Sequence, residues 1–513
     1  MDRSYYKRLL QVVTYFLVIT IFGTASAAFL TIRVSPLSGD NASSSAKAHI
    51  TQLLKNDPIL KGSVNVGEFN DQEVLVVVSG EITPSKDGEM FRPKVTVRKV
   101  KEAGHYAISL PIGFINDKAE PAFFPHQKTT LLSEQPLKQP AVFLNFLHVL
   151  VLLEKEQWQS AALKLTDLME AYRADQNWVE YANLKQTIAF CYKQTNDIAS
   201  LRKGIAFLQE SAEFFHNEKK TAQYGIIQND LAITHQMLAA LRAEPDQNLN
   251  FSINAFNEAI KAGKSSSDPS TDIAIAQNNL GLSYQALAFF GVRPAENLVF
   301  AMNILKEAET ALEKHKNKEI VIMTQYNLGM TYQLLSSWNI DPIPNLKKSI
   351  ERFKNTADLL KDQKNYAMAQ SSLGVSYQAL ASWGESPEEN LKLAIALLVE
   401  AARVLKEQQN NIGYPATSAN LGLGYQALAK RSIDSAVNFG HSIVPLEEAA
   451  TIWKAQNNKA GFSMAKNNLG VSYLALADSN IEPEKNKKLS EASFKEAQAK
   501  PQEKLQEKPA VSK

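Results

Sequence analysis

The side chains that could perform acid–base, nucleophilic or metal chemistry are scattered along this sequence of 513 residues. Its 8 histidines include no pair at the helical spacing that a metal site uses. The single cysteine, Cys191, excludes an intrachain disulfide framework, and we expect it to be a small buried residue in a helix. No nucleophile elbow, phosphate-binding loop, dinucleotide fingerprint or metalloprotease helix occurs. The sequence therefore predicts a protein that is not an enzyme and that needs no metal or cofactor.

A competing interpretation is an enzyme or a ligand-binding β domain, with the helical region as a self-association arm. Its candidate side chains are the acids and histidines between residues 48 and 127, namely Glu68, Asp71, Glu73, Glu81, His105 and His126. They have no recognisable catalytic spacing, so this interpretation ranks second. A third interpretation is a purely structural helical region that self-associates.

One string of residues recurs through the second half of the chain. The string NNLGLSYQALA contains Gly281, and its copies contain Gly329, Gly374, Gly422 and Gly470, spaced by 48, 45, 48 and 48 residues. A degenerate copy has alanine at position 232. An asparagine follows each of these six positions by 16 residues: Asn248, Asn297, Asn345, Asn390, Asn438 and Asn486. We expect each asparagine to be the N-cap of a second helix. Each unit is therefore predicted to be helix A, a loop of roughly ten residues and helix B, stacked as a solenoid.

The string itself predicts two faces on helix A. Leu280, Tyr284 and Leu287 form one apolar stripe at helical spacing, which we expect in the core. The glycine lets neighbouring helices approach closely. Asn279 and Leu282 lie on the opposite side. A glutamine near this side could form a polar rim of the channel or bond between repeats, and we favour the bond between repeats: Gln236, Gln285, Gln333, Gln378 and Gln426.

This organisation resembles the tetratricopeptide repeat, whose first helix has the Leu-Gly-x-x-Tyr core seen from Leu280 to Tyr284. The resemblance covers roughly residues 141–500, and the long units of 45–49 residues resemble those of bacterial, often cyanobacterial, repeat proteins. It implies an α-solenoid whose concave channel is lined by helix A. It also implies that the asparagine before Leu-Gly contacts an extended peptide. The peptide-binding residues it indicates are Asn279, Asn327, Asn420, Asn468, Leu282, Met330, Val375, Leu423 and Val471. Asp230 and Ser372 interrupt the row of asparagines.

Two roles remain open for these asparagines. An amide can both donate and accept, as a peptide backbone requires. Alternatively, the asparagines bond between neighbouring A helices and stiffen the stack.

The N-terminal segment decides the expected compartment. Residues 9–32 include no charged side chain, and Arg3, Lys7 and Arg8 precede them. Such a run is long enough to cross a bilayer core of about 30 Å. The basic flank predicts a single-pass membrane protein with its C-terminal region extracytoplasmic, periplasmic or lumenal. Ala25-Ser26-Ala27 also fits a signal-peptidase site, which would give a secreted protein.

The remaining boundaries follow from composition. We predict a signal anchor or signal peptide at 1–33, a linker at 34–47, a small β-rich, sandwich-like domain at 48–127, a linker at 128–140, helical repeats at 141–500 and a disordered tail at 501–513. Lys and Arg number 55 against 53 Asp and Glu, a net charge of +2 that supplies no field for nucleic acid. The leading hypothesis is a mainly α, membrane-tethered scaffold that binds protein or peptide partners, for assembly of an envelope or membrane complex.

Overall fold

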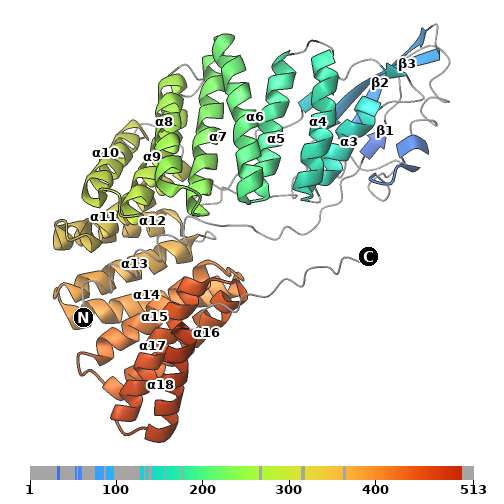
Figure 1. Cartoon of the computed structure of the whole chain (residues 1–513). Coiled ribbons are helices and arrows are strands. Elements are labelled where there is room, and N and C mark those ends of the chain that lie inside the picture. The colour runs from blue at the N-terminus through green and yellow to red at the C-terminus, as the bar shows by residue number, and fades with distance from the viewer. Residues whose placement is uncertain are drawn as a thin grey trace, which may run out of the picture. The chain divides into compact units, whose positions relative to one another are not determined.

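The computed structural model describes mainly helices (Figure 1). The described residues are 32–34, 52–54, 56–60, 76–85, 88–97, 128–131, 135–136 and 141–498, the last range with gaps at 155, 175, 177, 265–268, 313–317 and 362–364. The predicted membrane span lies outside these residues except for its last residue, Ile32, which belongs to a strand instead of a helix. The predicted tail also lies outside them. Within the described ranges, no helix combines the length and the apolar content needed to cross a bilayer.

The described strands form one five-stranded sheet. They are β1 (Ile32–Val34), β2 (Val76–Ser85), β3 (Gly88–Val97), β4 (Lys128–Leu131) and β5 (Gln135–Pro136). The order is β1-β2-β3-β4, with β5 also paired to β3. β2 and β3 pair antiparallel, with Val76 opposite Val97 in the register, and both strands include β-branched residues that favour sheets. β4 and β5 lie within 128–140, where the sequence predicted a linker. A second sheet, which a sandwich requires, is not found among these strands.

Sixteen helices follow in the described part of the chain. They are α3 (Ala141–Glu154), α4 (Trp158–Ala174), α5 (Trp178–Gln194), α6 (Ile198–Asn217), α7 (Thr221–Ala240), α8 (Pro245–Gly263), α9 (Pro269–Phe289), α10 (Pro294–Leu312), α11 (Lys318–Ser337), α12 (Pro342–Leu359), α13 (Tyr366–Ser382), α14 (Pro387–Glu407), α15 (Gly413–Ala429), α16 (Ser435–Ala455), α17 (Lys459–Asp478) and α18 (Pro483–Gln498). Contacts divide them into two units, one up to residue 324 and one from residue 325, and each unit is described by itself.

Successive helices pack in pairs, as the repeat predicts. The repeated strings lie in α7, α9, α11, α13, α15 and α17, which are the A helices, and each following helix is the B helix. Packing of α7 on α8, α13 on α14 and α15 on α16 is extensive. The predicted long loop is wrong: residues 241–244 alone connect α7 to α8, and 383–386 connect α13 to α14. The extra length of the repeat lies instead in long helices such as α14, which has 21 residues.

The prediction that the repeated asparagine caps helix B is also wrong. Helix α14 begins at Pro387, so Asn390 already lies within its first turn. Its Nδ2 atom donates to the carbonyl oxygen of Glu385, at 2.7 Å, instead of its oxygen accepting from the helix. The other five make the same bond to the residue five positions earlier: Asn248, Asn297, Asn345, Asn438 and Asn486. Ser386, just before the helix, has φ +36° and makes no side-chain cap.

The repeated glycine allows the close helix contact that we predicted. A Cβ atom on Gly374 would lie 2.8 Å from Leu398 Cγ, and one on Gly422 would lie 2.6 Å from Leu446 Cγ. Both leucines belong to the B helix of the same repeat. A side chain at either position would therefore separate helices A and B.

Cys191 is buried in α5, as expected. It packs in a cluster with Leu165 and Leu168 of α4. Burial raises the pKa of its thiol to about 12, because the charged thiolate would lose its hydration. The thiol is therefore a core group without nucleophilic character at neutral pH.

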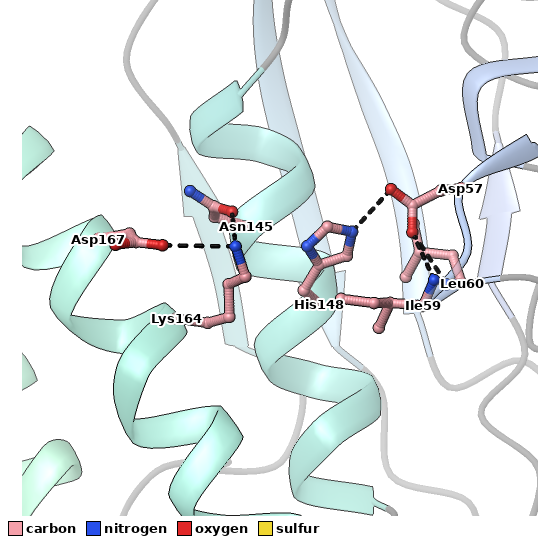
Figure 2. Close-up of polar contacts among 7 residues, drawn as sticks. All are labelled: Asp57, Ile59, Leu60, Asn145, His148, Lys164 and Asp167. Atoms are coloured by element: carbon pink, nitrogen blue, oxygen red, sulfur yellow. Dashed lines mark hydrogen bonds and ion pairs between the residues drawn. The ribbon is translucent and has the colours of Figure 1, made fainter. Parts of the chain in front are cut away.

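A segment before the helices is fastened to α3 (Figure 2). His148 Nε2 lies 2.8 Å from Asp57 Oδ2. Asp57 Oδ1 accepts the N–H groups of Ile59 and Leu60, at 2.9 and 3.1 Å. The side chain of Leu60 is completely buried, and Ile59 packs against the cluster of α3 to α5. The segment therefore covers apolar surface at the start of the helical region.

Candidate functional site

Glutamines of the A helices bond each repeat to the next. Gln333 Nε2 donates to the carbonyl oxygen of Ser372, at 2.9 Å, and to Ser376 Oγ, at 2.5 Å. Gln426 makes the same two contacts, to Asn468 O at 2.8 Å and Ser472 Oγ at 2.6 Å. Gln236 repeats the pattern in the other unit. The predicted role between repeats is confirmed for these residues.

One of these glutamine contacts between repeats, that of Gln378, differs from the others. Gln378 Nε2 donates to Asn420 O at 2.8 Å, but the next residue in the pattern is Gly424 instead of serine. A Cβ atom on Gly424 would lie 2.5 Å from Gln378 Nε2. Gln378 therefore keeps the hydrogen bond to the backbone but has no hydroxyl group to donate to.

Serines of the B helices complete these polar clusters, and our sequence analysis missed them. Ser349 Oγ donates to Gly329 O at 2.9 Å and lies 3.0 Å from Ser376 Oγ in the next repeat. Ser442 Oγ lies 2.6 Å from Ser472 Oγ. The available signal was a serine four residues after the repeated asparagine of helix B, at Ser252, Ser349, Ser442 and Ser490.

The predicted peptide-binding residues are mostly buried. Asn279 and Asn327 are completely buried, and Asn420 and Asn468 are 1% and 4% exposed. The apolar members Leu282, Met330, Val375 and Leu423 are buried too, and Val471 is half-buried. The reason is that consecutive A helices contact one another, as α13 and α15 do. The row is therefore not an exposed ladder of amides.

Three of the nine residues nevertheless meet at a hollow between α11, α13 and α15: Met330, Val375 and Asn420. The other lining residues are Gln333, Met368, Ser371, Ser372, Ile412, Gly413, Ala416 and Thr417. The hollow leaves about 30 Å³ for the centres of water-sized groups, within about 450 Å³ of atom-free space that includes open solvent. Asn279, Asn327, Asn468, Leu282, Leu423 and Val471 do not line it. All of its residues belong to the unit that begins at residue 325.

Two departures from the repeat explain why space remains at this place. Ala416 stands six residues before its glycine, where the neighbouring repeats have Met368 and Met464. Ser372 stands where most repeats have the asparagine before Leu-Gly. Smaller side chains at both positions leave unfilled volume between A helices that otherwise pack closely.

Most hydroxyl groups at the hollow are already bonded. Ser371 Oγ lies 2.8 Å from Thr417 Oγ1, and Tyr326 OH lies 3.0 Å from Ser372 Oγ. The amide of Asn420 differs from these hydroxyl groups, since its buried Oδ1 has no hydrogen-bond partner among the residues that the structure describes. Leaving a buried polar atom unbonded costs about 1–3 kcal/mol.

The helices that line the hollow have no charged side chains of their own beside it. Helices α13 and α15 include no Asp, Glu, Lys, Arg or His, and α11 has none after Glu319. The other unit differs, because Asp230 of α7 accepts from Gln186 Nε2 at 2.8 Å and Lys193 Nζ at 3.3 Å. Asp230, one of the two residues that interrupt the asparagine row, is thus part of an ion pair with Lys193.

Of the catalytic candidates in the β-rich region, the structure describes Glu81 alone. Glu81 lies in β2, opposite Arg92 of β3 in the strand register. The other five candidates lie outside the described residues. Among the described side chains, no group of three His, Cys, Asp or Glu is arranged to bind a metal ion.

Comparison with known proteins adds little. No family model matches the chain, and no curated protein matches it. One similar solved structure is described as a "Circular tandem repeat protein with novel repeat topology and enhanced subunit contact surfaces". It is 14% identical, the match covers 70% of this chain and 94% of that one, and the TM-score is 0.24. A likeness at that score supports no argument. The helices themselves define a helical repeat protein, consistent with tetratricopeptide-like helix pairs.

Proposed function

We propose that this protein is a non-enzymatic scaffold that binds an uncharged, extended polypeptide segment on the A helices of the unit beginning at residue 325. The observation that supports this best is the hollow, at which Met330, Val375 and Asn420 meet with an unbonded amide oxygen. Pockets of this kind, mostly apolar with a few polar groups, are typical of binding sites.

The dimensions of a repeat suit a polypeptide. Adjacent helices pack about 8–10 Å apart, and three residues of an extended chain span about 10 Å. One contact per A helix therefore matches every third residue of the partner. The Asn420 amide can meet a backbone N–H group of such a chain.

The absence of charge on α13 and α15 restricts the partner further. A charged group entering this surface would lose hydration, and neither helix supplies a counter-charge, which is strongly unfavourable. The proposed partner segment is accordingly neutral where it crosses these helices.

A phage-displayed library of random short peptides, selected on the full chain, tests the proposal. We expect enriched peptides that lose about tenfold or more in affinity when Met368→Glu places a charge beside the hollow. The matched control is Val399→Glu on α14, at a side chain that is 44% exposed, where affinity should be unchanged. Fluorescence anisotropy gives the dissociation constants and circular dichroism checks folding. A library that enriches no sequence, or peptides equally affected by both variants, contradicts the proposal.

We also propose that residues 9–32 tether the scaffold to a membrane, with the repeats on the extracytoplasmic side. This part rests on the apolar run and its basic flank alone. A role in assembling an envelope or membrane complex would follow from that location.

A further inference from the structure

We propose that the hollow between α11, α13 and α15 is a specificity pocket for one methionine or leucine side chain of the bound segment, with a backbone N–H of the same segment donated to Asn420 Oδ1. This inference rests on the proposed function and adds the identity of the side chain that is selected.

The size of the missing group comes from the repeat itself. At the position of Ala416 the two adjacent repeats have Met368 and Met464. Alanine therefore lacks the three heavy atoms that methionine has beyond Cβ. Methionine and leucine each supply three such atoms, so either side chain from a partner would replace the atoms that Ala416 lacks.

The walls match an apolar occupant of this kind. Met330, Met368, Val375 and Ile412 line the hollow. Methionine side chains are flexible and polarisable, so they adapt to an inserted aliphatic group. Removing a medium-sized apolar side chain from water favours binding through the hydrophobic effect.

Charge complementarity restricts the class of ligand. No charged side chain occurs on α13 or α15. An acidic, basic or phosphorylated side chain would therefore be desolvated there without a counter-charge from these helices. An apolar side chain has no such penalty.

One buried polar atom among the residues that line the hollow has no hydrogen-bond donor. Ser371 and Thr417 bond each other, and Gln333 donates to the adjacent repeat. Asn420 is 1% exposed, and its Oδ1 accepts no hydrogen bond from any described residue. A backbone N–H beside the inserted side chain would supply that bond once the Asn420 amide turns toward the hollow.

The variant Ala416→Met tests the pocket, because it installs the residue that adjacent repeats already tolerate. The probe is a peptide enriched on the full wild-type chain. We expect Ala416→Met to weaken its binding about tenfold or more. The matched control is Ile275→Met, at the same repeat position in α9, which should leave affinity unchanged.

A double-mutant cycle separates this inference from the proposed function. Replacing the peptide's methionine or leucine by alanine should weaken binding to wild type, and should cause no further loss on Ala416→Met. The pocket is contradicted if the two losses are independent and additive, or if the peptide binds Ala416→Met as tightly as wild type. Either result leaves the proposal of peptide binding intact. A selection that enriches nothing overturns both.

Methyl NMR of the nine methionines gives a second readout, which does not depend on the Ala416→Met variant. On wild-type protein, the peptide should shift the methyl signals of Met330 and Met368. The signals of Met237 and Met302, which do not line the hollow, should stay in place. Unshifted Met330 and Met368 signals at saturating peptide overturn the proposal.

Discussion

Gly422 and Gly440 lie in the two helices of one repeat but in opposite surroundings. A Cβ atom on Gly422 would lie 2.6 Å from Leu446 Cγ and 3.1 Å from the carbonyl oxygen of Ser442. A Cβ atom on Gly440 would meet nothing within 4 Å. The same substitution should therefore have opposite effects at the two positions.

We predict that Gly422→Ala destabilises the protein by about 1–3 kcal/mol, because the added methyl group forces helices α15 and α16 apart. Gly440→Ala should stabilise it by about 0.5–1 kcal/mol, because alanine favours a helix interior over glycine. Urea unfolding of both variants measures the difference. Equal shifts of the two midpoints would show that Gly422 does not determine the helix contact.

The start of helix B shows which features of a structure a sequence pattern can predict and which it cannot. The constant offset of Asn390 and its equivalents correctly indicates a recurring structural position, but the helix begins three residues earlier, at Pro387. The sequence does not reveal which amide atom is used, because asparagine both donates and accepts. The N-cap hypothesis chose the oxygen, whereas the tight loop presents a carbonyl group to the nitrogen.

Asn390→Asp distinguishes these two uses of the amide. At an N-cap, aspartate and asparagine are about equally favourable. In the observed contact a carboxylate cannot donate to the Glu385 carbonyl, so we predict a loss of about 1–3 kcal/mol. Thermal unfolding measures it, with Asn390→Ala as the reference for a simple loss of the bond. An aspartate variant as stable as wild type would restore the N-cap interpretation.

The elements as a whole were easier to predict than the site. Leu280 and Leu287 are buried as their spacing indicates, and the six repeated strings lie on A helices. The two-faced A helix was wrong, because Leu282 and Asn279 on the other side are buried as well. Neighbouring A helices cover that side, and no property of one helix alone contains this information. The hollow depends on the small side chain of Ala416. Its effect can be recognised only when the positions of the neighbouring helices are known.

At the scale of the whole molecule, the tether makes a prediction about topology. A reporter that is active only after export, fused after Lys513, should be active in cells, because the basic residues before the apolar run remain in the cytoplasm. The same reporter fused to a chain lacking residues 1–33 is the control and should be inactive. N-terminal sequencing of the mature protein distinguishes an anchor from a cleaved signal peptide. Activity of a cytoplasm-only reporter at the C-terminus would rule out the tether.

The glutamine ladder has a consequence for how such a chain can diversify. Gln333, Gln378 and Gln426 donate to the main-chain oxygen of Ser372, Asn420 and Asn468, so the bond is the same whether the acceptor residue is serine or asparagine. Every residue type offers that oxygen. Mutation can therefore alter the side chain at this position without disconnecting adjacent repeats. Duplicated repeats can drift apart in binding preference while the register of the array is inherited unchanged.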